Sequence, residues 1–502
     1  MIRWNDSQNA GSNDLGALLR WLGRTAASLL SALLLVGIGF YLNFLWSGPP
    51  LEPWHKTRLA SEFTADDYER GRIVTLEQYR AREQQLLEQV RTEIALPPAG
   101  ENELAISRYI PGSLGDPGVW DFNWNQTYVL KPEGEPIGGV LLLHGLTDSP
   151  YSLRSIGQAL AGRGYHVVGL RLPGHGTAPS GLLTFEVEDL AAATKLAMKD
   201  LRTTLGSARP IHMIGYSNGA ALAVNYTLDA RADSELPRPA GLVLISPAIG
   251  ITRLAAIGRI RTGLSDLQGF GRAAWQLVEA EVDPYKYQSF SFHASGQTQR
   301  LTRGLSRRIA ALAAPGPVPD MPPILAFIST VDSTVQAPAV IDSLLGRLTP
   351  EGHELVVFDV NRLAVVQPLL INDPAPLTRR LLAQTQRPFA LTLITNANAQ
   401  TLQVQERRSP AAGAAMTERV LQLAWPRNVF SLSHVALPFP PDDPLYGFAA
   451  PATTRHVQLG RLEIRGENGM LNVPSWMLTR QRSNPFHGYM LERIEGFVAT
   501  PP

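Results

Sequence analysis

The chain has 502 residues, of which 44% are hydrophobic and 18% charged, and its formal net charge is +1. This is the balance of a globular protein, long enough for one large domain with insertions or for two ordinary domains. The near-neutral charge, without a long basic run, argues against nucleic acid as a partner. The absence of cysteine excludes disulfide bonds, thiol catalysis and cysteine-based zinc sites.

An apolar run of about 21 residues without a charge, residues 26–46, is long enough to cross a bilayer as a helix. Tyr41 and Trp46 near one end and Trp21 near the other fit the interfacial positions of aromatic residues. We therefore predict a short tail over residues 1–25 and a transmembrane helix over 26–46. A cleaved signal peptide is the main alternative, but the run is longer than usual for one and no A-x-A-like site follows it.

Basic residues on the two sides of this run give a weak orientation signal. Arg20 and Arg24 lie directly before it, while Lys56 and Arg58 follow it at a short distance. The positive-inside rule then favours a cytoplasmic N-terminus and a single pass. The body of the protein would lie outside the cytoplasm, which is the periplasm in a Gram-negative bacterium.

Residues 47–110 are expected to form a linker and a spacer helix. Thr75 and Gln78 fit the two positions of a capping box. Apolar residues then recur at near-helical spacing as far as Ile94, and Pro97 ends the pattern. The pattern predicts a helix with one apolar face packed on the body. A dimerising helix is the alternative.

From about residue 137 the pattern changes to short apolar runs that alternate with amphipathic helical segments. Near-continuous apolar strands separated by such helices are typical of a parallel sheet covered on both faces. The predicted strands read GGVLLL, YHVVGL, IHMIGY, GLVLIS, PILAFIS, HELVVFDV, FALTLITN and NVFSLSH. We expect residues 111–502 to form one α/β domain of this kind.

A candidate nucleophile, Ser217, lies in the pentapeptide GYSNG between the fourth of these strands and an alanine-rich helix. The pentapeptide matches G-x-S-x-G, in which a tight strand-to-helix turn exposes the serine oxygen above the sheet. Gly215 and Gly219 leave room for that turn. With 43 glycines in the chain, about 0.2 matches are expected by chance, so the strand before and the helix after carry the inference. The alternative is a structural turn with an idle serine.

A serine hydroxyl needs a base, because it is almost fully protonated at neutral pH. Where a G-x-S-x-G pentapeptide forms such an elbow, the partners follow in the order serine, acid, histidine. Asp332 lies just past a buried strand and His434 at the end of the last predicted strand. An aspartate in that place can orient the imidazole and stabilise its cation. We predict the triad Ser217, Asp332 and His434.

Other residues compete for the acid and base roles. Asp359 also ends a predicted strand and is the second choice for the acid, and Asp342 lies nearby. His353 and His456 are the rival bases. Most of the histidines in a chain like this one are structural.

The motif HGLTDSP follows the first strong strand and predicts an oxyanion hole. The backbone N–H of Leu146 would lie beside the serine and pair with the N–H of Asn218. Gly145, which precedes Leu146, and Tyr216, which precedes Ser217, are expected to contribute to substrate binding. A plain turn is the alternative interpretation.

Two segments are longer than simple crossovers. The first, residues about 250–320, is predicted to be a cap over the serine, with a helical decoration as the alternative. The second, residues about 361–427, has no role that the sequence indicates. The cap would supply an apolar substrate pocket through its aromatic residues, which are Trp275, Tyr285, Tyr287, Phe290 and Phe292.

The motifs HGLTDSP, LPGHGTAPSG, GYSNGA, VDSTV and SHVALPF together resemble those of the α/β-hydrolase superfamily. The branch they are most similar to is that of the serine aminopeptidase-like hydrolases, which include monoacylglycerol lipases and lysophospholipases. The resemblance implies the same triad, with Leu146 and Asn218 as the oxyanion pair. The membrane segment, the long N-terminal arm and the second insertion depart from the family pattern.

The resemblance implies hydrolysis of a carboxylic ester of an amphiphilic or lipid-like substrate through an acyl-enzyme on Ser217, without a metal or an organic cofactor. An aminopeptidase acting on short peptides is one alternative. Its carboxylates for the substrate ammonium would be Asp266, Glu279, Glu281 and Asp283, which otherwise form a solvated face. A non-catalytic membrane-tethered binding protein is another, and its signature would be an incomplete triad. The oligomeric state is left open.

Overall fold

The computed structural model of the chain describes most of its residues. The described ranges are residues 11–47, 49–98, 106–249, 271–332, 337–350, 352–365, 367–370, 373–384, 386–411, 415–461 and 480–500.

The body is built on one 10-stranded sheet with the order β1-β3-β2-β4-β5-β8-β9-β10-β11-β12. The pairs from β3 through β10 are parallel, while β1 and the β11–β12 hairpin at the two edges pair antiparallel. The strands are β1 (Tyr128–Leu130), β2 (Gly138–Leu143), β3 (Tyr165–Leu170), β4 (Ile211–Tyr216), β5 (Gly241–Ile245), β8 (Ile324–Ser329), β9 (Glu354–Phe358), β10 (Ala390–Asn396), β11 (Gln403–Ser409) and β12 (Thr417–Ala424).

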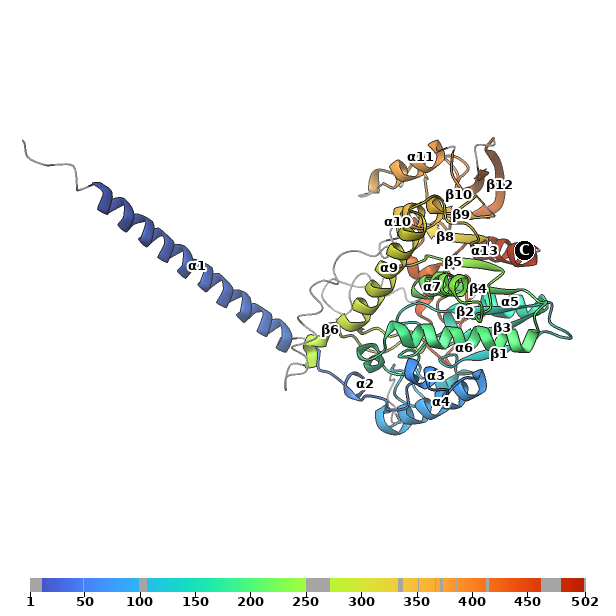
Figure 1. Ribbon diagram of the computed structural model, residues 1–502, viewed down its shortest axis with the longest axis horizontal. Helices are drawn as coiled ribbons and strands as arrows, with labels where there is room; N and C mark the ends of the chain where they lie inside the picture. The colour runs from blue at the N-terminus through green and yellow to red at the C-terminus, as the bar shows by residue number, and fades with distance from the viewer. Residues whose placement is uncertain are drawn as a thin grey trace, which may run out of the picture.

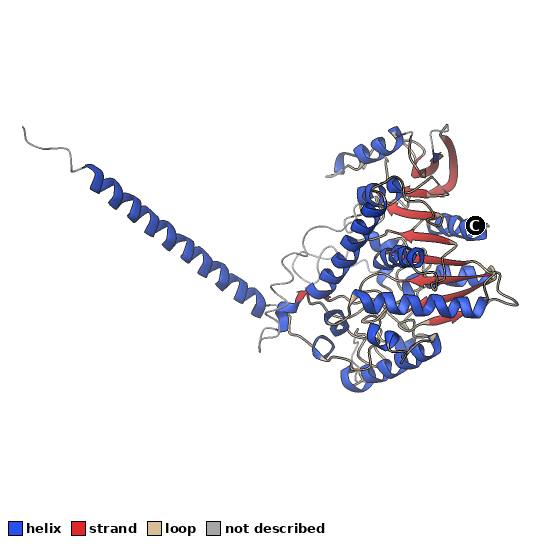
Figure 2. Cartoon of the chain, viewed as in Figure 1, coloured by secondary structure: helices blue, strands red, loops and turns tan. Residues whose placement is uncertain are grey.

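Helices cover both faces of the sheet, as Figure 2 shows. Successive side chains along a strand point to opposite faces, so a continuous apolar strand such as β2 feeds two cores. Leu141 and Leu143 lie in one core, and Val140 and Leu142 lie in the other. The helices of the first core are α6 (Val187–Leu205), α7 (Asn218–Ala232), α9 (Phe292–Leu312), α10 (Ala337–Ser343) and α11 (Ala375–Ala383), and those of the second are α5 (Arg154–Gly162) and α13 (His487–Ala499).

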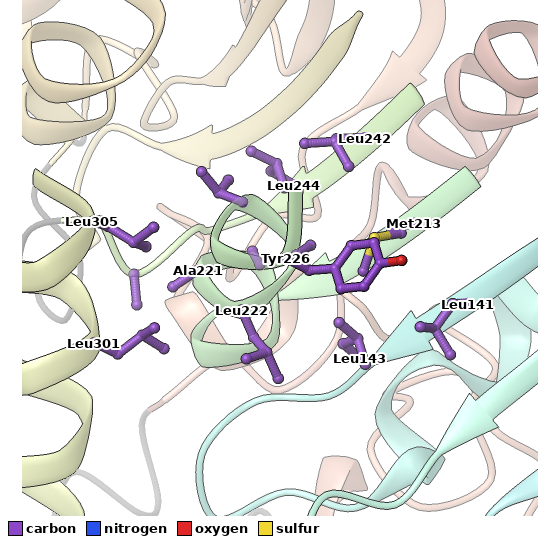
Figure 3. Close-up of a cluster of buried hydrophobic side chains, with 14 of the residues drawn as sticks. Leu141, Leu143, Met213, Ala221, Leu222, Tyr226, Leu242, Leu244, Leu301 and Leu305 are labelled. Atoms are coloured by element: carbon purple, nitrogen blue, oxygen red, sulfur yellow. The ribbon is translucent and has the colours of Figure 1, made fainter. Parts of the chain in front are cut away.

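Helix α7, which follows the candidate serine, lies at the centre of the first core. Its alanine-rich sequence lets it approach β2, β4 and β5 closely, and α9 packs on its outer side (Figure 3). The labelled side chains of this cluster are Leu141, Leu143, Met213, Ala221, Leu222, Tyr226, Leu242, Leu244, Leu301 and Leu305. A close-packed core of this kind holds the start of α7 in a fixed position relative to the sheet.

The predicted doubly covered parallel sheet is confirmed, but one predicted strand is wrong. Residues 428–433 form turns and irregular backbone, and His434 begins a short 3-10 turn, His434–Ala436. The position beside β10 is taken by the hairpin β11–β12, so segment 361–427 extends the main sheet. The chain after β12 lies outside the sheet, so it can pass over the carboxyl ends of the strands.

Helix α1 (Gly11–Ser47) projects from the body (Figure 1). Its window Leu19–Gly39 has a mean hydropathy of 1.6 and no buried residues. It is the one helix in the described part of the chain that is long and apolar enough to cross a membrane, a test that a signal sequence also passes. The apolar window begins earlier than the predicted span over residues 26–46.

The segment between α1 and the sheet packs on the body through α2 (Pro53–Lys56), α3 (Ala65–Glu69) and α4 (Leu76–Gln89). The predicted capping box at Thr75 and Gln78 is present. Arg171, at the end of β3, is 1% exposed and pairs with Glu62 and with Glu83 of α4. The arm therefore supplies the carboxylates that neutralise a buried arginine of the body.

Candidate active site

The turn at Ser217 has the strained geometry of a nucleophile elbow. Ser217 follows β4 and precedes α7, with φ 53° and ψ −113°, a conformation that a residue with a side chain rarely adopts. A Cβ on Gly215 would lie 2.4 Å from the Cα of Ala220, and one on Gly219 would lie 2.1 Å from the carbonyl oxygen of Leu143. Both glycines are thus required for the close approach of strand and helix.

The structure brings Ser217, His434 and Asp332 together in a line. Nε2 of His434 lies 3.0 Å from Oγ of Ser217, and Nδ1 lies 2.7 Å from Oδ2 of Asp332. The serine is 8% exposed, and the side chains of the histidine and the aspartate are 6% and 2% exposed. Burial keeps water from weakening these hydrogen bonds. The arrangement can transfer a proton from the serine to an imidazole held in one orientation.

The rival acids are engaged elsewhere. The carboxylate of Asp359 accepts hydrogen bonds from the Arg362 guanidinium at 2.8 and 2.9 Å and from the hydroxyl of Thr395 at 3.0 Å. Asp342 lies in α10, where its side chain is 57% exposed and pairs with Arg380. Neither contacts the imidazole of His434 in the described structure.

The rival bases lie away from the serine. His353 precedes β9, so it lies at the amino end of a strand parallel to β4, whereas Ser217 follows the carboxyl end of β4. The ring of His456 stacks on Trp120 with centroids 4.0 Å apart. The position of His353 and the stacking of His456 fit structural roles for both histidines.

The two residues of the predicted oxyanion hole lie in the elbow and in the turn after β2. Asn218 is the first residue of α7, where a backbone N–H has no acceptor within the helix. Leu146 lies in a turn closed by a 3.2 Å hydrogen bond from the Asp148 N–H to the Gly145 carbonyl. A Cβ on Gly145 would lie 3.0 Å from the ring of Tyr216, so the turn and the elbow touch at this glycine.

The ring of Tyr216 lies 5.3 Å from that of His434 and is 1% exposed. Its hydroxyl donates to the backbone carbonyl of His434 at 3.4 Å. Burial raises the pKa of Tyr216 well above its usual value, so the phenol stays neutral and remains a donor. In this structure the Tyr216 side chain packs against the turn that carries His434.

His144 joins the Gly145–Asp148 turn to the loop after β3. The Leu172 N–H donates to Nε2 of His144 at 3.0 Å, so Nδ1 carries the proton and donates to the carbonyl of Gly145 at 2.8 Å. Burial lowers the pKa of His144 well below its usual value, which keeps the ring neutral in this role.

Two cavities adjoin the histidine and the aspartate. One of about 290 Å³ is lined by His434, Phe430 and Arg480, among others. The other, of about 810 Å³, borders Asp332 and has a mainly apolar wall that includes Val360 and Leu370. Both have a size suited to part of a small organic molecule.

Of the predicted cap, residues 271–320 are described, and residues 250–270, with Asp266, lie outside the described residues. The predicted solvated acidic face is wrong for Glu281 and Asp283, which are 1% and 0% exposed. Burial raises the pKa of Glu281 to about 7. Its carboxylate accepts hydrogen bonds from the backbone N–H groups of Gln288 and Ser289, so it stabilises the loop between residues 281 and 289.

The aromatic residues of this segment pack mostly inward. Trp275, Tyr285, Tyr287 and Phe292 are each less than 9% exposed. Tyr285, for example, stacks on Tyr151 with ring centroids 4.3 Å apart. Their rings fix the segment to the body.

Two residues at the Gly145–Asp148 turn, Asp148 itself and Lys286 beside it, were not predicted from the sequence. Nζ of Lys286 lies 2.5 Å from Oδ1 of Asp148. Asp148 is part of the motif HGLTDSP, and Lys286 lies between the two tyrosines singled out in the cap. No spacing rule connects residues this far apart in sequence.

Comparison with known proteins adds a family model and one curated relative. Residues 134–314 match the family model described as serine aminopeptidase, S33. The chain is 32% identical over 124 residues to a thermostable monoacylglycerol lipase of Bacillus sp. (strain H-257). That match covers 25% of this chain and 46% of the relative, so the chain spans about half the length of the curated relative it matches.

Solved structures with a similar arrangement include two lipases. One is a soluble variant of monoglyceride lipase from Saccharomyces cerevisiae in complex with a substrate analogue, with a TM-score of 0.37 and 15% identity over 46% of this chain and 82% of that one. The other is a monoacylglycerol lipase from Paleococcus ferrophilus, with a TM-score of 0.35 and 17% identity over 47% and 89%.

Proposed function

We propose that this chain, which belongs to the α/β-hydrolase superfamily, hydrolyses carboxylic esters through an acyl-enzyme on Ser217. The observation that carries the proposal is the buried line from Ser217 through His434 to Asp332, with hydrogen bonds of 3.0 and 2.7 Å. The strained φ of 53° at Ser217 supports it, because such strain is kept where a side chain must be presented for reaction.

The mechanism follows from this geometry. His434 takes the proton of Ser217 through Nε2 as Oγ attacks the ester carbonyl carbon, and Asp332 stabilises the resulting imidazolium. The negative charge that develops on the carbonyl oxygen is stabilised by the backbone N–H groups of Leu146 and Asn218. His434 then protonates the leaving alcohol. Water, activated by the same imidazole, releases the acid and restores the serine.

We propose an amphiphilic or lipid-like ester as the substrate. The curated relative is a monoacylglycerol lipase by its name, and the cavity of about 290 Å³ that reaches His434 has Val429 and Phe430 in its wall. Buried Glu281 and Asp283 are occupied by internal hydrogen bonds, which disfavours them as partners for the ammonium group of a peptide.

We propose further that α1 anchors the protein in a membrane with a single pass and that the body lies outside the cytoplasm. The uncharged apolar run of residues 26–46 within α1 and the arginines at positions 20 and 24, directly before that run, support this topology. The full chain should then stay with the membrane pellet after a carbonate wash, and protease added outside spheroplasts should digest the body. Release by the wash, or protection from the protease, would contradict this topology.

The substrate class is tested with the full chain in detergent micelles. p-Nitrophenyl esters of graded acyl length are compared with aminoacyl anilides, with Ser217→Ala as the control. We expect ester turnover that depends on chain length and is abolished in Ser217→Ala. A preference for the anilides would instead favour the aminopeptidase.

A further inference from the structure

The turn that carries the Leu146 N–H is strained at its third residue. Thr147 has φ 67°, in the left-handed region that favours glycine and is unusual for a β-branched residue. A turn with positive φ at this position normally has glycine or asparagine there. The surrounding structure must therefore hold Thr147 in place.

A short segment of the cap, Asp283–Tyr287, makes the contacts that do so. The Tyr287 N–H donates to the carbonyl of Thr147 at 2.8 Å. Next to it, Nζ of Lys286 lies 2.5 Å from Oδ1 of Asp148, the last residue of the turn. The side chains of this pair are 24% and 5% exposed, so water screens the charges only in part.

The segment is itself fixed to the chain that follows His434. Oδ1 of Asp283 accepts from the N–H groups of Tyr285 and Lys286 at 3.0 and 3.1 Å, which shapes the segment. Oδ2 accepts from the hydroxyl of Tyr446 at 2.6 Å. One segment thus contacts both the Gly145–Asp148 turn and the chain that follows the base.

The carboxylate of Asp148 and the ring of Tyr216, next to the elbow serine, both lie against Gly145. A Cβ on Gly145 would lie 2.6 Å from Oδ2 of Asp148 and 3.0 Å from the ring of Tyr216. Without a cation beside it, this carboxylate would be a buried negative charge close to the place where the oxyanion forms. The Asp148 side chain would then move away from the turn to reach water. Where it stayed, its charge would repel the negative charge of the transition state.

We infer that Lys286 is a positioning residue for the oxyanion hole. Its ammonium group neutralises Asp148 and holds the Gly145–Asp148 turn in its strained form, and the turn in turn aims the N–H of Leu146. This inference rests on the proposed ester hydrolysis. It predicts that loss of the lysine weakens stabilisation of the transition state while binding of the ground-state ester is little changed.

The test measures kcat and KM for a p-nitrophenyl ester with the detergent-solubilised full chain, per active site titrated with a fluorophosphonate. Lys286→Met should lower kcat by ~10- to 100-fold with KM within about 2-fold, since small misplacements of catalytic groups have effects of this size. The inhibition constant of an alkyl boronic acid, whose oxygen occupies the oxyanion site, should rise by a similar factor. Lys286→Arg should restore most of kcat.

The matched control is Lys195→Met. Lys195 is also partly buried, at 33% exposure, and pairs with Asp229 across α6 and α7. Lys286→Gln, which keeps a donor without the charge, is measured beside Lys286→Met so that the result does not depend on the folding of one variant. If both Lys286 variants turn over as fast per active site as Lys195→Met, or lose only in KM, the inference is overturned. Activity that survives in Ser217→Ala would instead overturn the proposed function.

Discussion

Oγ of Ser217 lies 3.0 Å from Nε2 of His434, although the two residues are 217 positions apart in the chain. The serine is held by the elbow between β4 and α7, and the histidine by a 3-10 turn beyond the last strand of the sheet. The pair therefore depends on the packing of the whole domain.

The identity of the acid is tested by Asp332→Asn against Asp359→Asn. An asparagine at position 332 can hold the wrong tautomer of His434, and kcat should fall by ~10⁴-fold. Asp359 bonds Arg362 and Thr395, so its replacement should lower stability and leave kcat per folded molecule within about 3-fold. The measurement is kcat per titrated active site. A larger kcat loss in Asp359→Asn than in Asp332→Asn would show that the acid is misassigned.

The elbow's close packing is tested by Gly219→Ala. The new Cβ would lie 2.1 Å from a backbone oxygen, and the variant should lose activity and about 2 kcal/mol or more of stability. Gly304→Ala, in the middle of α9 with nothing within 4 Å of the new Cβ, is the control. It should gain about 0.5–1 kcal/mol, since alanine is the better helix former. Thermal midpoints report both changes, and equal midpoints for the two variants would contradict this account.

The N-terminal arm is expected to be part of the folded body. Glu83→Gln removes a charge from the buried Arg171 cluster, where both side chains of the pair are 1% exposed, and should cost about 3 kcal/mol. The exposed pair Arg91–Glu88 is the matched control, and Glu88→Gln should leave the urea midpoint almost unchanged, because water screens an exposed ion pair. Urea midpoints compare the two. A small effect at Glu83 would mean that the arm is only a tether.

Buried His212 on β4 predicts a defined pH dependence of stability. Burial lowers the pKa of His212 to about 4, and its ring is 2% exposed. Below the ordinary histidine pKa of about 6.5, the imidazole of His212 binds a proton in the unfolded chain. In the folded chain the same imidazole stays neutral until the pH reaches about 4. Stability from this group is therefore lost as pH falls from 6.5 toward 4.

His212→Leu removes this loss. The stability of the variant relative to the original chain should rise as the pH falls, by at most about 1.4 kcal/mol per pH unit between pH 6.5 and 4. Urea unfolding at several pH values measures the difference. Met213→Leu, a change on the same strand without a titrating group, should show a constant difference. A constant difference for His212→Leu as well would refute the assignment.

The sequence predicted the parallel core and the nucleophile because both are local signals. Strands β2 to β5 are continuous apolar runs, and the elbow is a pentapeptide between a strand and a helix. The strand predicted at residues 428–434 failed because Val429 and Leu432 pack on the second core without sheet pairing. The ion pair of Asp148 and Lys286 could not be predicted from the sequence, because the two residues are 138 positions apart and meet only in the folded chain.

The central claim is that Ser217 forms a covalent acyl-enzyme. It is tested most directly by mixing the detergent-solubilised chain with an excess of a p-nitrophenyl ester, quenching in acid within the first turnovers and measuring the intact mass. The account predicts a burst of p-nitrophenol equal to the active sites and a mass increase of one acyl group, mapped to the Ser217 peptide and absent in Ser217→Ala. Ester turnover without that adduct in the original chain, or undiminished turnover in Ser217→Ala, would contradict it.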